Sequence, residues 1–267
     1  MIGWIRAAVA LGLVAAATPF LVLWLLIARA VGRGEGLAPR LWYRLAARAL
    51  GLRVHAIGAL AGQRPLLIAA NHVSWIDIVV LGSMAEVSFI AKSEMAGWPV
   101  IGALARWQRT IFVERDNRRR SGHQVDEIAG RLASGKALVL FPEGTTNDGN
   151  CVGAFKSTLF GAAAGAMSAE GSAVHVQPVA IAYTRLQGLP MGRRHRHRAA
   201  WIGDQDLAPH VLALIREGGI DVEVRFGEPF LSDGSSGRKQ AAARAQAEVQ
   251  AMMAASLASP LPSRRRS

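Results

Sequence analysis

The sequence has little cysteine and little acidic charge. A single cysteine, Cys151, excludes an intrachain disulfide, so we expect the bulk of the chain to face a reducing cytoplasm and this thiol to be buried and without a catalytic role. Only 19 acidic residues accompany 31 basic ones, and the net charge of +12 attracts anionic partners such as phospholipid, nucleic acid or an acidic carrier protein. Charged residues make up 19% and hydrophobic residues 51%, a balance that excludes a disordered chain and favours membrane contact.

A long stretch without charge lies near the N-terminus, between Arg6 and Arg29. As a helix, residues 7–28 would reach about 33 Å, enough to cross a hydrocarbon core of about 30 Å. We expect a membrane helix here; the alternatives are a cleaved signal peptide and a re-entrant hairpin bent at Pro19. More arginines follow this stretch than precede it, which predicts that the rest of the chain lies on the cytoplasmic side of the inner membrane.

A second basic pattern follows in the sequence PRLWYRLAARALGL. Arg40, Arg44 and Arg48 recur every fourth residue, and the apolar side chains lie off that stripe. This pattern predicts a basic amphipathic helix on an anionic membrane surface. The alternative is an ordinary helix whose charged face is solvated.

From about residue 53, short apolar runs alternate with longer alanine-rich stretches. This alternation predicts an α/β domain with a mixed, largely parallel sheet flanked by helices. The expected strands are 65–70, 87–91, 110–113, 137–141, 174–183 and 221–227, and the expected helices are 76–84, 118–134, 155–168 and 206–217. We divide the chain into membrane-anchoring helices (1–52), the α/β domain (53–237) and a C-terminal helix with a basic tail (238–267).

The sequence NHVSWID follows the first of these strands and contains His72 and Asp77. In a continuous helix, a spacing of five residues would turn the two side chains roughly 140° apart, so they meet only if a turn separates them. Ser74 and Asp77 match a capping box, which supplies that turn at the start of a helix. The carboxylate could then fix the imidazole tautomer and leave the other nitrogen free to take a proton. The alternative is that Asp77 only caps the helix and His72 packs in the loop.

A second motif, FPEGTT, follows the strand 137–141. Ligands bind at strand ends in open α/β sheets, and here Gly144 would allow close backbone approach while Glu143 and Thr145 offer polar anchors. A plain turn with no functional role is the alternative.

Together, NHVSWID and FPEGT resemble the lysophospholipid acyltransferase family, as do the block 92–116 and the sequence VQPVAI at 176–181. The resemblance implies that His72 is the general base and Asp77 its orienting partner, a role that contributes about 10²–10⁴-fold in rate. The residues assigned to the substrate site are Lys92, Arg115 as a phosphate or head-group contact, Glu143, Gly144, Thr145 and Lys156.

The sequence departs from the family pattern at two positions, Arg109 in place of a glycine and Thr146 in place of an arginine. The second change removes a bidentate phosphate contact. Lys156 or Arg109 could substitute, or the acceptor could carry a less anionic head group. The sequence FPEGTTNDG followed by FKS also resembles the lyso-ornithine lipid acyltransferase branch. Lysophosphatidic acid, the commoner acceptor in the family, and lyso-ornithine lipid are therefore the two leading acceptors.

We expect a membrane-associated O-acyltransferase that moves a fatty acyl group from acyl carrier protein or coenzyme A to a lysolipid hydroxyl. The sequence has no GxSxG elbow, which favours direct attack without an acyl-enzyme, and no metal or cofactor is implied. The rivals are a thioesterase or hydrolase that uses the same His-Asp pair and a non-catalytic lipid-binding membrane protein. The basic runs 114–120, 193–198 and 264–266 lack interleaved aromatics, so we expect no nucleic acid partner and read His195 and His197 as surface residues.

Overall fold

The computed structural model describes residues 1–98, 101–108, 110–113, 128, 130–132, 135–160, 174–203, 205–232 and 237–261. Its helices are α1 (Ile2–Val31), α2 (Leu37–Leu50), α3 (Ile76–Met84), α4 (Ile101–Trp107), α7 (Leu207–Glu217) and α8 (Gly237–Ala258), with short 3₁₀ turns at Ser93–Gly97 and Arg196–Arg198. Its strands are β1 (Leu52–Ile57), β2 (Leu66–Ala70), β3 (Val87–Lys92), β4 (Ile111–Val113), β5 (Ala137–Leu140), β6 (Val174–Leu186), β7 (Leu189–Pro190), β8 (Ile220–Phe226) and β9 (Phe230–Ser232).

These strands form one sheet in the order β1-β8-β6-β2-β5-β3-β4, with β7 and β9 also paired to β6. Neighbours along this order are parallel except β6 and β8, and β7 and β9 run antiparallel to β6. The mixed, largely parallel sheet expected from the sequence is therefore confirmed. The carboxyl ends of β2 and β5 lie side by side, so the loops after them meet at one edge of the sheet.

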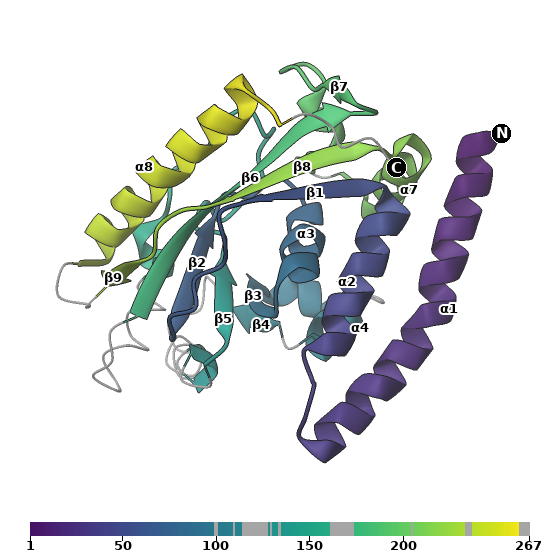
Figure 1. Ribbon diagram of the computed structural model, residues 1–267, viewed down its shortest axis with the longest axis horizontal. Coiled ribbons are helices and arrows are strands. Elements are labelled where there is room, and N and C mark those ends of the chain that lie inside the picture. The colour runs from purple at the N-terminus through teal and green to yellow at the C-terminus, as the bar shows by residue number, and fades with distance from the viewer. Residues whose placement is uncertain are drawn as a thin grey trace.

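Helices cover both faces of the sheet (Figure 1). Alternate side chains of β2 point to opposite faces, as the pleat requires. Leu66, Ile68 and Ala70 belong to the apolar core beneath α1, α2, α3 and α7, whereas Leu67 and Ala69 belong to the core beneath α8. The strand is buried on both sides, which explains why its sequence is a continuous apolar run.

The expected helices 76–84 and 206–217 correspond to α3 and α7, and all six expected strands form. Sequence reasoning missed β1, β7 and β9, the last two because they are only two and three residues long. Most of the expected helices 118–134 and 155–168 lies outside the described residues, although residues 157–160 are helical.

Helix α1 is continuous through Pro19, so a helix forms as expected and the alternative of a hairpin bent at this residue is wrong. The helix bends about halfway along its length (Figure 1), as helices do where proline removes a backbone donor. Near its start, the Arg6 guanidinium donates to the carbonyl of Glu217 at 3.3 Å. Near its end, Arg29 donates to the carbonyl of Trp107 at 2.8 Å. Both ends of α1 therefore contact the α/β domain.

Helix α2 forms as expected, but two of its arginines do not lie on a free surface stripe. Arg40 donates to the carbonyl of Met84 at 2.7 Å, and Arg44 donates to the carbonyl of Ser83 at 3.1 Å. These carbonyls end α3, where helical backbone acceptors lack intrahelical donors and a cation is favourable. The periodicity of these arginines thus partly reflects capping of a neighbouring helix, which the sequence pattern cannot distinguish from contact with lipid.

Candidate active site

His72 and Asp77 meet at the carboxyl end of β2. His72 lies in the loop after the strand, and Asp77 lies in the first turn of α3. The distance between His72 Nδ1 and Asp77 Oδ2 is 2.8 Å. The His72 ring stacks on Phe141, with centroids 4.1 Å apart and planes 14° apart. The side chain of His72 is 19% exposed, whereas that of Asp77 is fully buried. The imidazole is thus held on one face and one edge, and it keeps access to solvent.

The Asp77 carboxylate is surrounded by donors. Oδ2 accepts from the backbone N–H of Val73 at 2.7 Å and of Ser74 at 2.9 Å, in addition to the imidazole. Oδ1 accepts from the Tyr183 hydroxyl of β6 at 2.7 Å. Burial raises the pKa of Tyr183 well above its usual value, and nearby Asp77 raises it further, so this hydroxyl stays protonated and donates. These donors offset the cost of burying the charge.

The capping box expected between Ser74 and Asp77 is only half formed. Asp77 accepts from the Ser74 backbone N–H, as that motif requires, but the helix N-cap is Trp75 and has no side-chain cap bond. Within the described residues, the Ser74 hydroxyl is buried without a hydrogen-bond partner. The Asp77 carboxylate therefore organises the loop while it also binds the imidazole.

Glu143, in the loop after β5, links the two loops of the site. Its Oε1 accepts from the His72 backbone N–H at 2.7 Å, and its Oε2 accepts from Asn147 Nδ2 at 2.6 Å and from the Gly153 N–H at 2.7 Å. The residue is only 4% exposed, and this burial raises the pKa of its carboxyl while the three donors oppose the rise. We expected Glu143 at the acceptor site; this geometry favours a role in positioning the His72 loop.

Gly144 is buried and has a φ of 75°, a left-handed conformation that strains other residues. Its N–H donates to the carbonyl of Phe141 at 3.1 Å, so the glycine closes the turn that places Glu143. The next residue, Thr145, is exposed at the surface of this loop. The hydroxyl of Thr146, which stands where the family usually has arginine, donates to the carbonyl of Trp201.

The remaining expected site residues are less completely defined. Lys156 has an exposed side chain, and its backbone N–H donates to the carbonyl of Pro142 at 2.8 Å, close to the Glu143 loop. Lys92 ends β3, and nothing is described of its side chain. Arg115 and Arg109 lie outside the described residues. The substrate contacts assigned to these four residues stay predictions.

Two expectations about the chain near the site need correction. Cys151 is exposed, not buried, because it lies in a surface loop after β5. In the basic run 193–198, His195 and His197 are exposed as expected, but Arg196 is only 6% exposed. Its guanidinium donates to Asn150 Oδ1 and, at 2.9 Å, to the carbonyl of Met191, so it fixes the loop that follows FPEGTT.

Sequence reasoning also missed Asn71 and Tyr183. The fully buried Asn71 side chain bonds the carbonyl of Ile181 at 2.9 Å and its N–H at 2.7 Å, which fixes the end of β2 against β6. Asn71 directly precedes His72, and that position could have signalled its role. Tyr183 gave no local signal, because it ends an ordinary apolar strand pattern.

An open apolar pocket of about 750 Å³ lies beside this site, between α2, α3 and β3. It is lined by Trp42, Tyr43, Trp75, Ile78, Val79, Phe89, Ala91, Met95, Trp98, Leu104, Ala105, Gln108, Thr110, Trp201 and Leu207. Trp75, which follows the His72 loop, lines one end of the pocket, whereas His72 itself is not among the lining residues. A base held by a buried carboxylate beside an apolar pocket is suited to activate a hydroxyl or a water next to a hydrocarbon chain.

The fold and the site together define an α/β domain in which a buried carboxylate holds a partly exposed histidine. Comparison with known proteins identifies its family. The family model described as Acyltransferase matches residues 51–182. The lyso-ornithine lipid O-acyltransferase of Rhizobium meliloti is 49% identical over 247 residues, which cover 90% of this chain and 83% of that protein. The chain therefore belongs to the acyltransferase family, among the enzymes that acylate lysolipids.

Two further relatives support the family and the fold. The 1-acyl-sn-glycerol-3-phosphate acyltransferase of Neisseria gonorrhoeae is 38% identical over 141 residues, 52% of each chain. The crystal structure of the 1-acyl-sn-glycerophosphate acyltransferase of Thermotoga maritima matches with a TM-score of 0.63 and 21% identity, over 98% of this chain and all of that one. At 21% identity, the match to the Thermotoga maritima structure supports the fold alone.

Proposed function

We propose that this acyltransferase esterifies the free hydroxyl of lyso-ornithine lipid with a fatty acyl group from a thioester, acyl carrier protein or coenzyme A. The similarity to the Rhizobium meliloti enzyme over 90% of the chain carries the choice of acceptor. Lysophosphatidic acid is the second candidate, supported by the Neisseria gonorrhoeae relative over about half of the chain. Residue 146 is a threonine whose hydroxyl donates to the carbonyl of Trp201. This position therefore supplies no guanidinium that could bind a phosphate.

The proposed chemistry uses both nitrogens of His72. Nδ1–H donates to Asp77, which leaves Nε2 unprotonated to take the proton of the acceptor hydroxyl. The oxygen then attacks the thioester carbonyl, the C–S bond breaks, and the leaving thiolate takes the proton back from Nε2. The buried Asp77 carboxylate stabilises the imidazolium that forms between these two steps.

The apolar pocket is suited to hold the acyl chain of the donor. Its lining is almost entirely hydrocarbon and aromatic, and it extends from Trp75 beside the His72 loop to Tyr43 and Gln108. An acyl chain of the thioester can lie there while its carbonyl stays near the imidazole. Burial of that chain then orients the carbonyl for attack.

The test is an acyl-transfer assay with the purified protein in lipid vesicles and a labelled acyl thioester. Lyso-ornithine lipid and lysophosphatidic acid are supplied separately at equal concentration. We expect a higher kcat/KM for lyso-ornithine lipid, and a preference for lysophosphatidic acid rejects the proposed acceptor. Fatty acid release at the same rate without any lysolipid supports the thioesterase rival instead.

We further propose that α1 lies within one leaflet of the bilayer, on the cytoplasmic side of the inner membrane. Helix α1 exposes many large apolar side chains, including Trp4, Phe20 and Trp24. Both of its ends nevertheless contact the α/β domain, and the Arg216 guanidinium lies 4.2 Å from the Trp4 ring centre. A helix that crosses the bilayer separates its two ends by the full hydrocarbon thickness, which fits poorly with these contacts.

Thiol labelling separates the two arrangements. The exposed Cys151 reports the side on which the α/β domain lies. In a Cys151→Ser background, Ile2→Cys reports the side of the N-terminus. We expect an impermeant reagent to label both positions from the same side of a sealed vesicle. Labelling from opposite sides shows that α1 spans the membrane.

A further inference from the structure

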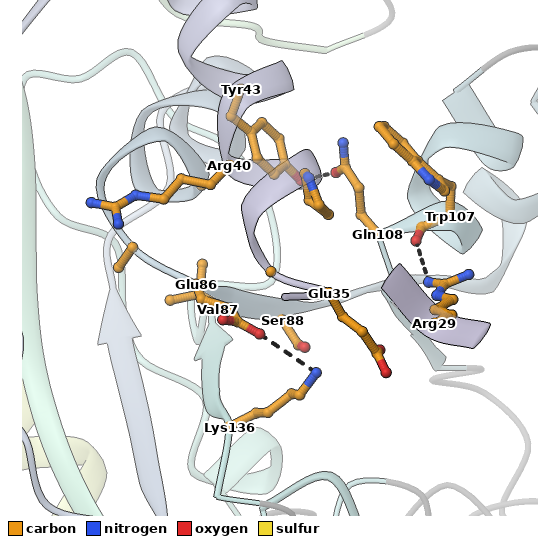
Figure 2. A pocket seen from close by; sticks show the side chains of 14 residues that line it. Arg29, Glu35, Arg40, Tyr43, Glu86, Val87, Ser88, Trp107, Gln108 and Lys136 are labelled. Carbon is orange, nitrogen blue, oxygen red and sulfur yellow. Dashed lines mark hydrogen bonds and ion pairs between the residues drawn. The ribbon is translucent and has the colours of Figure 1, made fainter. Parts of the chain in front are cut away.

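A second, polar pocket lies where α1 is followed by α2 (Figure 2), and His72 is not among its lining residues. It is lined by Arg29, Glu35, Gly36, Pro39, Arg40, Tyr43, Gly82, Ala85, Glu86, Val87, Ser88, Trp107, Gln108 and Lys136. These residues come from the end of α1, from α2, from the C-terminal end of α3 and from the segments that precede β3, β4 and β5. The catalytic residues lie instead at the carboxyl ends of β2 and β5 and at the start of α3.

Several N–H donors in this pocket are unsatisfied. Arg40 Nε, Trp107 Nε1 and Gln108 Nε2 are buried and have no hydrogen-bond partner within the described residues. The Tyr43 hydroxyl, whose pKa is raised by burial, donates to Gln108 Oε1, which leaves the amide nitrogen to face elsewhere. A buried donor without an acceptor is costly, so such donors indicate a missing partner that supplies oxygen atoms. Arg40 points away from Trp107 and Gln108 (Figure 2), so a single partner can meet only the donors of the last two.

The charges of the pocket favour an anionic partner. Arg29, Arg40 and Lys136 outnumber the carboxylates Glu35 and Glu86. Lys136 Nζ lies 3.6 Å from the carboxylate of Glu86 (Figure 2). The Glu86 side chain is 56% exposed. A pair with that separation and exposure holds the lysine weakly. The Lys136 amine can therefore bind a stronger acceptor such as a phosphate oxygen.

The pocket is also placed where lipid head groups are concentrated. It lies beside Arg29, in the last turn of the apolar helix α1, and the next basic side chains belong to α2. Basic pockets at the ends of membrane helices bind anionic lipid head groups. We propose that this pocket binds the phosphate group of an anionic bilayer phospholipid, next to the apolar pocket, with which it shares Tyr43 and Gln108. The bound lipid would join the membrane helix α1 to α2, α4 and the start of β5.

Lipid retention tests this proposal without reference to turnover. The full-length protein is reconstituted in vesicles of phosphatidylcholine containing a minor fraction of phosphatidylglycerol, then extracted, and the lipid that stays bound is measured by native mass spectrometry. We expect phosphatidylglycerol to be enriched over its share in the vesicle. Lys136→Gln and Trp107→Phe should each lower this enrichment roughly tenfold, the effect of losing one hydrogen bond to a charged group.

Trp107→Phe is the sharper variant, because it removes the indole N–H and keeps a smaller aromatic ring beside Trp42. In vesicles of phosphatidylcholine alone, the loss of an unpaired donor and the loss of packing act in opposite directions, so we expect only a small change in the unfolding temperature. The control is Arg48→Gln, which removes one exposed charge from α2 outside the pocket and should leave the enrichment unchanged. Unchanged enrichment in Lys136→Gln and Trp107→Phe, or an equal loss in Arg48→Gln, overturns the proposal.

A separate arm distinguishes a lipid from a free anion. Inorganic phosphate is added to the protein in a neutral detergent, and thermal unfolding is followed. We expect inorganic phosphate to leave the unfolding temperature unchanged and phosphatidylglycerol to raise it, with the increase lost in Trp107→Phe. An equal increase with inorganic phosphate overturns the lipid as the ligand and makes the pocket a soluble-anion site.

Discussion

The two ends of α3 differ in how completely their polar groups are paired. At its first turn, both oxygens of the buried Asp77 carboxylate accept hydrogen bonds, from the imidazole, two backbone N–H groups and Tyr183. At its last turn, Arg40 and Arg44 donate to the final carbonyls, yet the adjoining pocket keeps unpaired donors. The helix is nine residues long, so its end residues lie about 12 Å apart along the axis.

This difference separates a preorganised site from one that a ligand completes. A catalytic base must be oriented before the substrate arrives, so its supporting groups are fixed by the protein itself. A binding pocket can instead leave donors unpaired, provided that a ligand supplies the acceptors. Substitutions at the first turn should therefore change the rate, whereas substitutions at the last turn should change lipid retention.

The largest effect is expected for His72→Ala. Without a base to take the proton of the hydroxyl, kcat should fall about 10²–10⁴-fold. Retention of phosphatidylglycerol should match the wild type, because the imidazole contributes nothing to the pocket at the other end of α3. The unfolding temperature should fall, since the buried Asp77 carboxylate loses a donor and Phe141 loses a stacking partner. A variant with full activity contradicts the assignment of His72.

Asp77→Asn should have the next largest effect. It keeps the shape of the side chain but replaces a charge-assisted hydrogen bond to the imidazole by a neutral one, and it removes the charge that stabilises the imidazolium, a combined loss of about 1.5–3 kcal/mol. This corresponds to roughly a 10–100-fold lower kcat, with little change in KM. Steady-state kinetics over a range of acceptor concentrations separates kcat from KM, and a change confined to KM contradicts an orienting role.

Tyr183→Phe should have a smaller effect, because it removes one of the donors to Asp77 and leaves the others. The buried carboxylate then lacks a partner at Oδ1, which should lower the free energy of unfolding by about 1–3 kcal/mol. We expect kcat to fall less than in Asp77→Asn. The matched control is Thr184→Val at the next position of β6, which removes a buried hydroxyl 3.4 Å from the carbonyl of Asp221. Equal kinetic losses in both variants argue against a specific role for Tyr183.

The smallest effect is expected for the pH dependence of stability that arises from His210. Trp75 Nε1–H donates to His210 Nδ1 at 3.0 Å, so this nitrogen must be unprotonated, and burial lowers the pKa of His210 below 6.5. A histidine with a lowered pKa binds fewer protons when folded, so its contribution to stability is present above about pH 6.5 and is lost as the pH falls. His210→Asn keeps an acceptor for Trp75 but cannot titrate. Its unfolding temperature should fall less than that of the wild type on acidification, and equal slopes contradict this assignment.

Local patterns predicted the strands, α3 and the His-Asp pair, because the motif and the turn that brings its members together lie within one short segment. They did not reveal Tyr183, which binds Asp77 from 106 residues away. They also placed Arg40 and Arg44 on a membrane surface, since a stripe of charge looks the same whether it faces lipid or the end of a packed helix. The polar pocket could not be predicted from local patterns either, because its lining residues come from segments far apart in the sequence.

The central claim is that Asp77 orients His72 so that Nε2 is the free base. Nitrogen-15 NMR of the full-length protein labelled at histidine tests it most directly at a pH where the ring is neutral. We expect His72 to carry its proton on Nδ1, in a hydrogen bond that weakens in Asp77→Asn, and Nε2 to be unprotonated. A proton on Nε2, with Nδ1 unprotonated and no change in Asp77→Asn, excludes His72 Nε2 as the base.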